Sequence, residues 1–272
     1  MNLNMLEKLL RFQQPAKSLP YLNGLSDEQI AGLFTLDVGA YQARAADFTA
    51  RTHRTAATLL ENPAIATQVD QLPFTAGQHV VAIGESSTAD RLSWFEILRQ
   101  LLAIRRPNDA IRLTNLAVSG STTTQALSSL PGLGFHKPDW VLCQLGANDA
   151  QRIGGPEGPR LVSIAETERN FGWLYERVSQ LTSAEWIWLT PTAVDEARVS
   201  AFPHFERAQI SWSAMDLETT AQLLIERPEP TIDVLSCTTP TPDTHLEDGV
   251  HLTELGQQQV TAAVVAALAD LT

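Results

Sequence analysis

From Gly77 onward, short apolar runs alternate with longer amphipathic stretches, and this alternation constrains the fold more than any other feature of the chain. The apolar runs are continuous, as is typical of strands buried on both faces of a sheet. They predict strands at HVVAI (79–83), IRLTNLA (111–117), WVLCQLG (140–146), WIWLT (186–190) and TIDVL (231–235).

Amphipathic stretches predict the helices that lie between these strands. They run near 90–105, 121–130, 164–182 and 206–227, and a final one runs from Thr253 to Leu271. Strands that alternate with helices form a parallel sheet covered on both faces. We therefore expect a doubly wound α/β domain over residues 76–272, with a five-stranded parallel sheet between two layers of helices. Sites in such domains lie outside the carboxyl ends of the strands.

Residues 1–75 are predicted to form a helical N-terminal extension. Ser26, followed three residues later by Gln29, is a capping box. Residues 39–62 are rich in Ala, Thr, Arg and Leu and favour a long helix, and no strand is expected before Pro73. The sequence leaves three roles open for the extension: a lid, a contact in a homo-oligomer, or support for the sheet.

The overall charge and the cysteines exclude some classes of protein. A net charge of −12 without a basic cluster argues against nucleic-acid binding, which requires Lys and Arg to neutralise phosphates. The sequence contains no run of about 18 apolar residues, so no membrane span is predicted. The N-terminus does not resemble a signal peptide, and Cys143 and Cys237 are expected to be buried free thiols. Together these features predict a cytoplasmic protein.

Four segments place chemically useful residues where a strand ends or a helix begins. The first strand is followed by Gly84, Glu85 and Ser86, and the second by NLAVSGSTT with Gly120. The third leads into LGANDA with Asn148, and DGVH places Asp248 three residues before His251 ahead of the last helix. In a parallel sheet these segments meet on one rim.

These residues supply the groups that acyl transfer requires: a hydroxyl nucleophile, a base, a group that orients the base, and donors for an oxyanion. Ser86, His251 and Asp248 fit the first three roles. The backbone N–H groups of Ser86 and Gly120 and the side-chain amide of Asn148 fit the fourth. A glycine at 120 would let the backbone approach the substrate oxygen.

Residues 78–270 resemble the SGNH/GDSL hydrolase superfamily. The resemblance rests on GES (84–86), Gly120, GAND (146–149) and DGVH (248–251), in the family's order. It implies a flavodoxin-like fold, with Ser86 as nucleophile, His251 as base and Asp248 as its partner. It also implies an oxyanion hole formed by Ser86, Gly120 and Asn148. Glu85 departs from the family's usual aspartate and is expected to alter local geometry more than reaction class.

The sequence predicts a serine esterase for small carboxylic esters, acetyl esters among them, that acts through an acyl-enzyme intermediate. A non-catalytic ligand-binding module on the same scaffold and an acyltransferase remain as alternatives. Phe202 and Phe205 follow the fourth strand and are expected either to line an acyl or aryl pocket or to anchor their loop. The specific ester is not determined by the sequence.

Other sites are less well supported by the sequence. Asp243 and His245 lie near Asp248 and His251 and together could ligate a metal, but an acidic surface loop is the simpler interpretation. His245 also competes with His251 for the role of base, although the helix after DGVH favours His251. No His-Glu-x-x-His motif and no nucleotide-binding glycine pattern occurs, so neither a metal nor a cofactor is expected.

Overall fold

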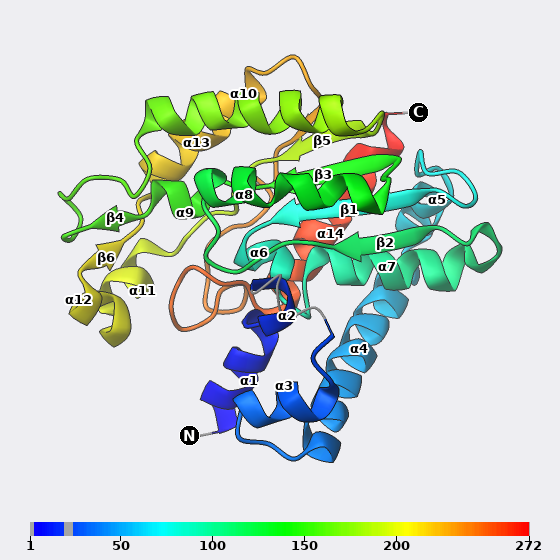
Figure 1. Cartoon of the computed structure of the whole chain (residues 1–272), viewed down its shortest axis with the longest axis horizontal. Coiled ribbons are helices and arrows are strands. Elements are labelled where there is room, and N and C mark those ends of the chain that lie inside the picture. Colours follow the sequence, from blue (N-terminus) through cyan, green and yellow to red (C-terminus); the bar gives the residue numbers. More distant parts are fainter. Residues whose placement is uncertain (1–2, 19–23, 272) are drawn as a thin grey trace.

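The computed structural model describes residues 3–18 and 24–271. At its centre lies a five-stranded parallel sheet with strand order β2-β1-β3-β5-β7 (Figure 1). Its strands are β1 (His79–Gly84), β2 (Arg112–Asn115), β3 (Trp140–Gln144), β5 (Glu185–Leu189) and β7 (Thr231–Ile232). Numbered within the sheet alone, the order is flavodoxin-like, with a switch point between β1 and β3. The predicted α/β fold is confirmed.

Helices cover both faces of the sheet because every central strand is apolar on both sides. On one face, Val80 and Ala82 pack with Leu142 against helices α7 (Trp94–Arg105) and α14 (Glu254–Ala269). On the other face, Val81 and Val141 pack against α8 (Thr123–Ser129) and α10 (Ile164–Leu181). Successive strand residues point to opposite faces, so each strand contributes to both cores. The layers are visible above and below the sheet in Figure 1.

The remaining elements of the sheet domain are mostly short, and the longest of them has 12 residues. They are α6 (Ser86–Ala89), α9 (Ala147–Ala150), α11 (Glu196–Ala201), α12 (Pro203–Ala208), α13 (Ala214–Ile225), the 3-10 helices η2 (Pro107–Asp109) and η3 (Leu130–His136), and the strands β4 (Arg152–Ile153) and β6 (Ile210–Ser211). In the described parts of the chain, no helix combines the length and the apolar character that crossing a bilayer requires.

The N-terminal extension is helical in its described residues. Its helices are α1 (Leu3–Phe12), α2 (Pro15–Ser18), α3 (Asp27–Leu33), α4 (Val38–Leu60) and α5 (Pro63–Asp70). The predicted capping box is present: Gln29 N donates to Ser26 Oγ, and Ser26 N donates to Gln29 Oε1. Leu59 and Val69 belong to the same core cluster as Val80 and Trp94. The extension therefore supports one face of the sheet.

Several predicted elements differ in extent from the structure, and two of the differences have a clear physical cause. The stretch predicted as one helix at 206–227 contains a break, because Gln209 takes a left-handed conformation with φ of 51° and ends α12. After the break, β6 pairs antiparallel with β4 before α13 begins. The strand predicted at 231–235 ends at Ile232. Beyond it, the Thr190 hydroxyl accepts hydrogen bonds from Val234 N and Leu235 N, each at 2.9 Å, and turns the chain away from the sheet.

Both cysteines are free thiols, but only one is buried as predicted. Cys143 lies within β3 and is fully enclosed, and burial raises the pKa of its thiol. Cys237 is exposed, which corrects the prediction. It follows the short edge strand β7 in a turn, where its Sγ donates to Asp233 O at 3.2 Å.

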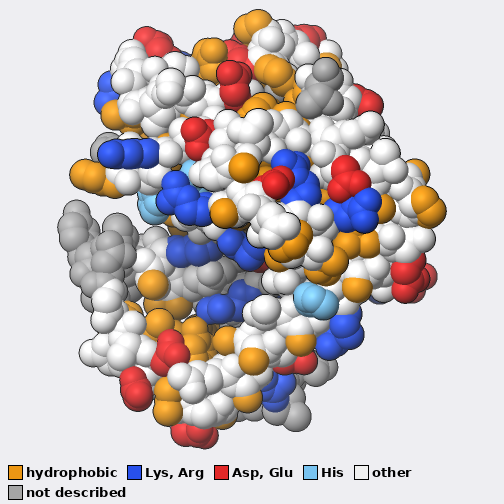
Figure 2. Space-filling view, turned by 90° about the vertical axis from the view of Figure 1, so that its right-hand side faces the viewer, with side chains coloured by type: hydrophobic (Ala, Val, Ile, Leu, Met, Phe, Trp, Pro, Cys, Tyr) orange, Lys and Arg blue, Asp and Glu red, His pale blue; other side chains and the backbone are white. Residues whose placement is uncertain are grey.

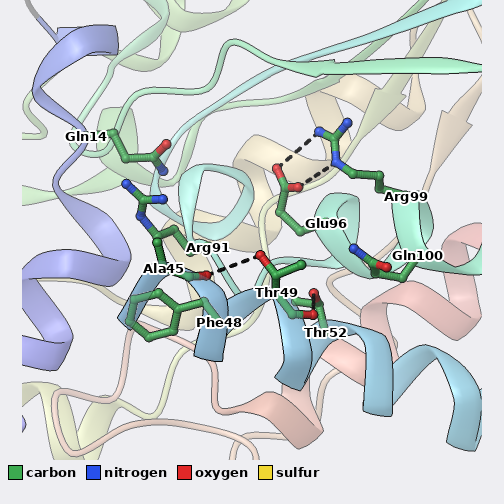
Figure 3. A pocket seen from close by; sticks show the side chains of 9 residues that line it. All are labelled: Gln14, Ala45, Phe48, Thr49, Thr52, Arg91, Glu96, Arg99 and Gln100. Carbon is green, nitrogen blue, oxygen red and sulfur yellow. Dashed lines mark hydrogen bonds and ion pairs between the residues drawn. The ribbon is translucent and has the colours of Figure 1, made fainter. Parts of the chain in front are cut away.

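A polar cavity of about 220 Å³ lies where α4 of the extension meets α7 of the sheet domain (Figure 3). Arg91 lines it and donates to Leu10 O and to Tyr41 Oη, each at 3.0 Å, while Arg99 pairs with Glu96 at 2.8 Å. Figure 2 shows basic side chains gathered in the hollow between the N-terminal helices and the part of the molecule above them. Polar contacts therefore reinforce the apolar junction of the two parts.

Candidate active site

The turn after β1 presents Ser86 at the rim of the sheet. Gly84 allows this turn because a Cβ there would lie 2.9 Å from both Gln144 O and the Thr88 side chain. Ser86 is the first residue of α6, so its backbone N–H belongs to the first turn, whose N–H groups have no acceptor within the helix. Within the described chain, the Ser86 hydroxyl has no hydrogen-bond partner. The turn thus offers both a free hydroxyl and a free N–H.

The DGVH segment folds into a turn that joins a histidine to a buried carboxylate. Asp248 Oδ1 accepts from Val250 N and His251 N, both at 2.9 Å, and Oδ2 accepts from His251 Nδ1 at 2.8 Å. Gly249 has a φ of +71°, and a Cβ there would lie 2.5 Å from Asp195 O. In the described residues His251 Nε2 has no protein partner. The ring is therefore oriented by Asp248 with its other nitrogen available as a base.

The Asp248 carboxyl is fully buried, yet it is held in the charged form. Burial alone would raise its pKa, but the charges and hydrogen bonds of His251 and Lys8 hold the pKa well below the usual range. Lys8 Nζ forms an ion pair with the same Oδ2 atom that accepts from His251. The carboxylate is thus shared between a histidine and a lysine that lie 243 positions apart in the chain (251 minus 8).

The loops after β2 and β3 place the remaining predicted residues opposite Ser86. Gly120 has a φ of +83°, and a Cβ there would meet no atom within 4 Å, so its backbone faces open space. The side-chain amide of Asn148 donates to Glu85 Oε2 at 2.8 Å and to Ser121 O at 3.0 Å. These two bonds fix the orientation of the amide at the edge of the cavity and engage both of its N–H groups, so a bond to a substrate oxygen would replace one of them.

Glu85 connects the turn after β1 with the turn after β3. Its carboxylate accepts from Ala147 N and Asn148 N, each at 3.0 Å, and from the Asn148 side chain. The residue is 1% exposed, and burial raises its pKa to about 8 even though the N–H donors of Asn148 and Ala147 favour the charged form. The longer side chain of glutamate, compared with the usual aspartate, therefore spans the two turns directly.

Replacing Glu85 by glutamine is expected to remove a pH-dependent part of the stability. Between its ordinary pKa of 4.5 and about 8, the folded carboxyl holds a proton that the unfolded chain has released. The free energy of unfolding of the wild type, relative to Glu85→Gln, should therefore fall by up to about 1.4 kcal/mol per pH unit as the pH rises through this window. Urea unfolding at pH values from about 5 to 8 measures the difference. The exposed Glu168→Gln is the control, and parallel curves for wild type and Glu85→Gln would contradict the assignment.

One cavity of about 620 Å³ brings the predicted residues together. It is lined by Ser86, Gly120, Asn148, Asp248 and His251, and by Phe202 and Phe205. Phe205 also packs on Trp212, with ring centroids 5.1 Å apart, so it lines the cavity and anchors its segment at once. His251, Ser86 and the oxyanion candidates thus face a common space of a size typical of small-molecule sites.

The N-terminal helix α1 contributes a wall to this cavity that the sequence does not predict. Lys8, Leu9 and Phe12 of α1 line it together with Met5 and Gln13. The Phe12 ring lies against the His251 ring, with centroids 4.4 Å apart. The amphipathic pattern of the first twelve residues predicts a helix with a buried face, but no local pattern shows which surface that face covers.

His245 lies in a different environment from His251. It is fully buried, and its ring nitrogens bond to Thr244 Oγ1 at 3.0 Å and to Ala193 O at 2.8 Å. Burial lowers its pKa. Both nitrogens are engaged within the protein and His245 does not line the cavity, so its role is to hold the DGVH loop against the chain after β5.

Comparisons with known proteins agree with the observed fold. The profile of the GDSL-like Lipase/Acylhydrolase family matches residues 74–259, whereas no curated protein matches significantly. A lipase/acylhydrolase from Enterococcus faecalis is 20% identical in sequence; the match covers 71% of this chain and 96% of that chain, with a TM-score of 0.54.

Two further solved structures show the same fold. LAE5, an alpha/beta hydrolase enzyme from the metagenome of Lake Arreo, is 22% identical; the match covers 73% of this chain and 98% of that chain, with a TM-score of 0.54. Axe2, an acetylxylan esterase from Geobacillus stearothermophilus, is 20% identical; the match covers 71% of this chain and 95% of that chain, with a TM-score of 0.55. The helix α1 lies outside the residues that the family profile matches.

Proposed function

Because the chain belongs to the GDSL-like lipase/acylhydrolase family, we propose that it is a serine esterase that hydrolyses small carboxylic esters through an acyl-enzyme intermediate. The observation that carries the proposal is the cavity itself. Ser86 and His251 line it with a free hydroxyl and a free ring nitrogen, and Asp248 bonds the opposite ring nitrogen. These side chains supply the nucleophile, the base and the orienting group that acyl transfer needs, gathered around one cavity.

In the proposed reaction, His251 Nε2 removes the proton from the Ser86 hydroxyl as its oxygen attacks the ester carbonyl. The tetrahedral oxyanion accepts hydrogen bonds from the N–H groups of Ser86 and Gly120, and from the Asn148 amide once one of its N–H groups exchanges the bond to Ser121 O for one to the substrate oxygen. His251 then gives its proton to the leaving alcohol, which leaves an acylated Ser86. Water attacks this acyl-enzyme with His251 again as base, and the carboxylic acid departs while Ser86 regains its proton.

The cavity supports an ester with an apolar acyl or aryl group. Beside the polar catalytic side chains, it is lined by Leu9, Phe12, Phe202, Phe205 and Trp212. An acetyl group leaves most of a space of about 620 Å³ unfilled, and each further buried methylene adds about 0.8 kcal/mol of favourable transfer free energy. We therefore propose that acyl chains longer than acetyl are the better substrates.

Asn148→Ala is expected to lower kcat by about 10²–10³-fold, because one oxyanion donor is lost. The Michaelis constant should change little, since the lost bond forms chiefly in the transition state. Steady-state hydrolysis of a p-nitrophenyl ester gives both constants. Thermal unfolding serves as the control, because the same change also frees Glu85 Oε2 from one of its donors. A wild-type kcat in a folded variant would remove Asn148 from the mechanism.

The test of the proposed function is hydrolysis of p-nitrophenyl esters from acetate to octanoate, combined with labelling by a fluorophosphonate. An esterase turns over at least part of the series and is labelled on a serine. A folded protein that is neither labelled nor active would instead be a ligand-binding module. Added alcohols provide a further comparison, because transesterified products would indicate an acyltransferase.

A further inference from the structure

Lys8 of the N-terminal helix reaches into the catalytic pocket. Its Nζ forms an ion pair with Asp248 Oδ2, and its side chain is 25% exposed whereas that of Asp248 is 1% exposed. The ammonium also lies over the Phe202 ring, 4.9 Å from its centroid. Among the described residues, Asp248 is the one carboxylate within ion-pair distance of Lys8. Lys8 is therefore directed at the catalytic carboxylate rather than at solvent.

Side-chain contacts hold helix α1 in the position that brings Lys8 to Asp248. The buried guanidinium of Arg11 donates to both oxygens of Asp90, at 3.1 and 2.6 Å, just after the helix that begins with Ser86. The carbonyl oxygen of Phe12 accepts from Ser119 Oγ at 2.7 Å, next to Gly120. These contacts join α1 both to the turn that carries Ser86 and to the loop after β2. The approach of Lys8 to Asp248 thus rests on a docked helix.

Several charged and titratable groups surround His251. They are Glu247 and Asp248 of its own loop, Lys8 and Arg11 of α1, Arg198 and His204 of α11 and α12, and Glu254 of α14. Arg11 is neutralised by Asp90, Arg198 pairs with Asp195 at 3.7 Å, and Glu254 pairs with Arg51. Lys8 is thus the cation in this group whose ion-pair partner is the catalytic Asp248.

We propose that Lys8 is a positioning residue of the catalytic centre, a fourth member beside Ser86, His251 and Asp248. Its ammonium shares Asp248 Oδ2 with His251 Nδ1, and so it both fixes the carboxylate and weakens the attraction of Asp248 for a protonated His251. Helix α1, which lies outside the residues that the family profile matches, would in this way influence how strongly Asp248 attracts His251. The inference rests on the proposed roles of His251 and Asp248.

The direction of the effect follows from electrostatics. A like charge within about 4–6 Å disfavours a second positive charge, and Lys8 and His251 bond to the same oxygen atom. The ammonium thus offsets part of the attraction that Asp248 exerts on a protonated His251. Without Lys8, the full charge of Asp248 acts on His251, which then holds its proton to higher pH.

The experiment compares wild type with Lys8→Met and Lys8→Arg. In Lys8→Met, the midpoint of the acidic limb of the pH profile of kcat/KM should rise by about 0.5–1 pH unit. Activity at pH about 5.5 should then fall by about 3–10-fold while activity near pH 8 changes by less than about twofold. Lys8→Arg keeps the charge and should keep the wild-type midpoint. An unchanged midpoint in folded Lys8→Met would overturn the proposal.

Glu7→Gln is the matched control, because Glu7 also lies on α1 and forms an ion pair across the fold, with Arg51, but does not line the cavity. If Glu7→Gln moved the midpoint as far as Lys8→Met, the effect would come from loosening the helix and the proposal would fail. If Lys8→Met does not fold, Lys8→Gln replaces it as the neutral variant.

A nuclear magnetic resonance titration of the His251 ring separates this inference from the proposed function. It reports the same midpoint without requiring turnover. If wild type hydrolyses no ester but the ring titration shifts upward in Lys8→Met, the proposed function fails and the role of Lys8 stands. If esters are hydrolysed and the ring titration is unchanged, the proposed function stands and the role of Lys8 fails.

Discussion

Replacing Ser86 by alanine is expected to lower ester hydrolysis by at least about 10⁴-fold. The variant lacks the oxygen that would carry the acyl group, so no acyl-enzyme can form. Because the Ser86 hydroxyl has no partner within the described chain, its removal breaks no hydrogen bond of the protein and leaves no buried polar group unsatisfied. The fold should therefore be unchanged while the chemistry is lost.

The measurement is kcat/KM for a p-nitrophenyl ester, together with fluorophosphonate labelling followed by mass spectrometry. Ser87→Ala is the matched control, because Ser87 is the next residue of the same helix but does not line the cavity. Labelling should occur on Ser86 in the wild type and in Ser87→Ala, and should be absent in Ser86→Ala. Substantial turnover by Ser86→Ala, or labelling that persists in it, would assign the nucleophile elsewhere.

Much of the fold could be predicted because the strands leave a strong local signal. Within the strand predicted at 79–83, residues 80–83 are apolar on both faces, as is typical of a strand covered by helices on both sides, and the observed β1 differs by one residue. The edge strand β7 was harder to predict. Its five apolar-rich residues resemble a full strand, yet the hydroxyl of Thr190, about forty positions earlier, turns the chain after two. A long-range contact of this kind does not change the local hydrophobic pattern from which strands are predicted.

The candidate site likewise contains residues that local motifs predict and residues that only long-range contacts reveal. Ser86, Asp248 and His251 belong to short motifs at strand ends, and the local turns place them in a common cavity. Lys8 could not be linked to Asp248 from the sequence, because a lysine on an amphipathic helix most often lies in solvent. Glu85 is intermediate. Its motif marked a departure from the family, but its bonds to the turn after β3 required the structure.

Removing residues 1–70 is expected to abolish both cooperative folding and activity. The sequence left support of the sheet as one role for the extension, and the packing favours that role. Ala56, Leu59 and Val69 lie in the core cluster under β1, each at most 5% exposed. Truncating a single large core side chain costs about 2–5 kcal/mol, and a whole domain is stable by only about 5–15 kcal/mol. The free-energy cost of losing this entire layer is therefore expected to exceed the stability of the domain.

The same truncation also leaves a charge unpaired in the interior. Asp90 is fully buried and its ionic partner is Arg11 of α1. Removing one member of a buried pair costs up to about 3–5 kcal/mol, and less where deletion of the covering segment lets water reach the remaining charge. A chain that begins at Leu25 separates the two contributions: it loses Arg11 and Lys8 but keeps α4 and α5, which supply the core residues. It should fold with a lower Tm and show little ester hydrolysis, since α1 forms one wall of the pocket.

Circular dichroism during heating, combined with an ester assay, measures both truncations beside the full chain. We expect a cooperative transition for the full chain, a transition at lower temperature for the chain starting at Leu25, and none for the chain starting at Gln71. This order follows because apolar burial by α4 and α5 outweighs the ion pair that α1 contributes. A chain starting at Gln71 that melts within about 5 °C of the full chain and keeps its kcat/KM would reduce the extension to an accessory, and the shared core would then not be what holds the sheet.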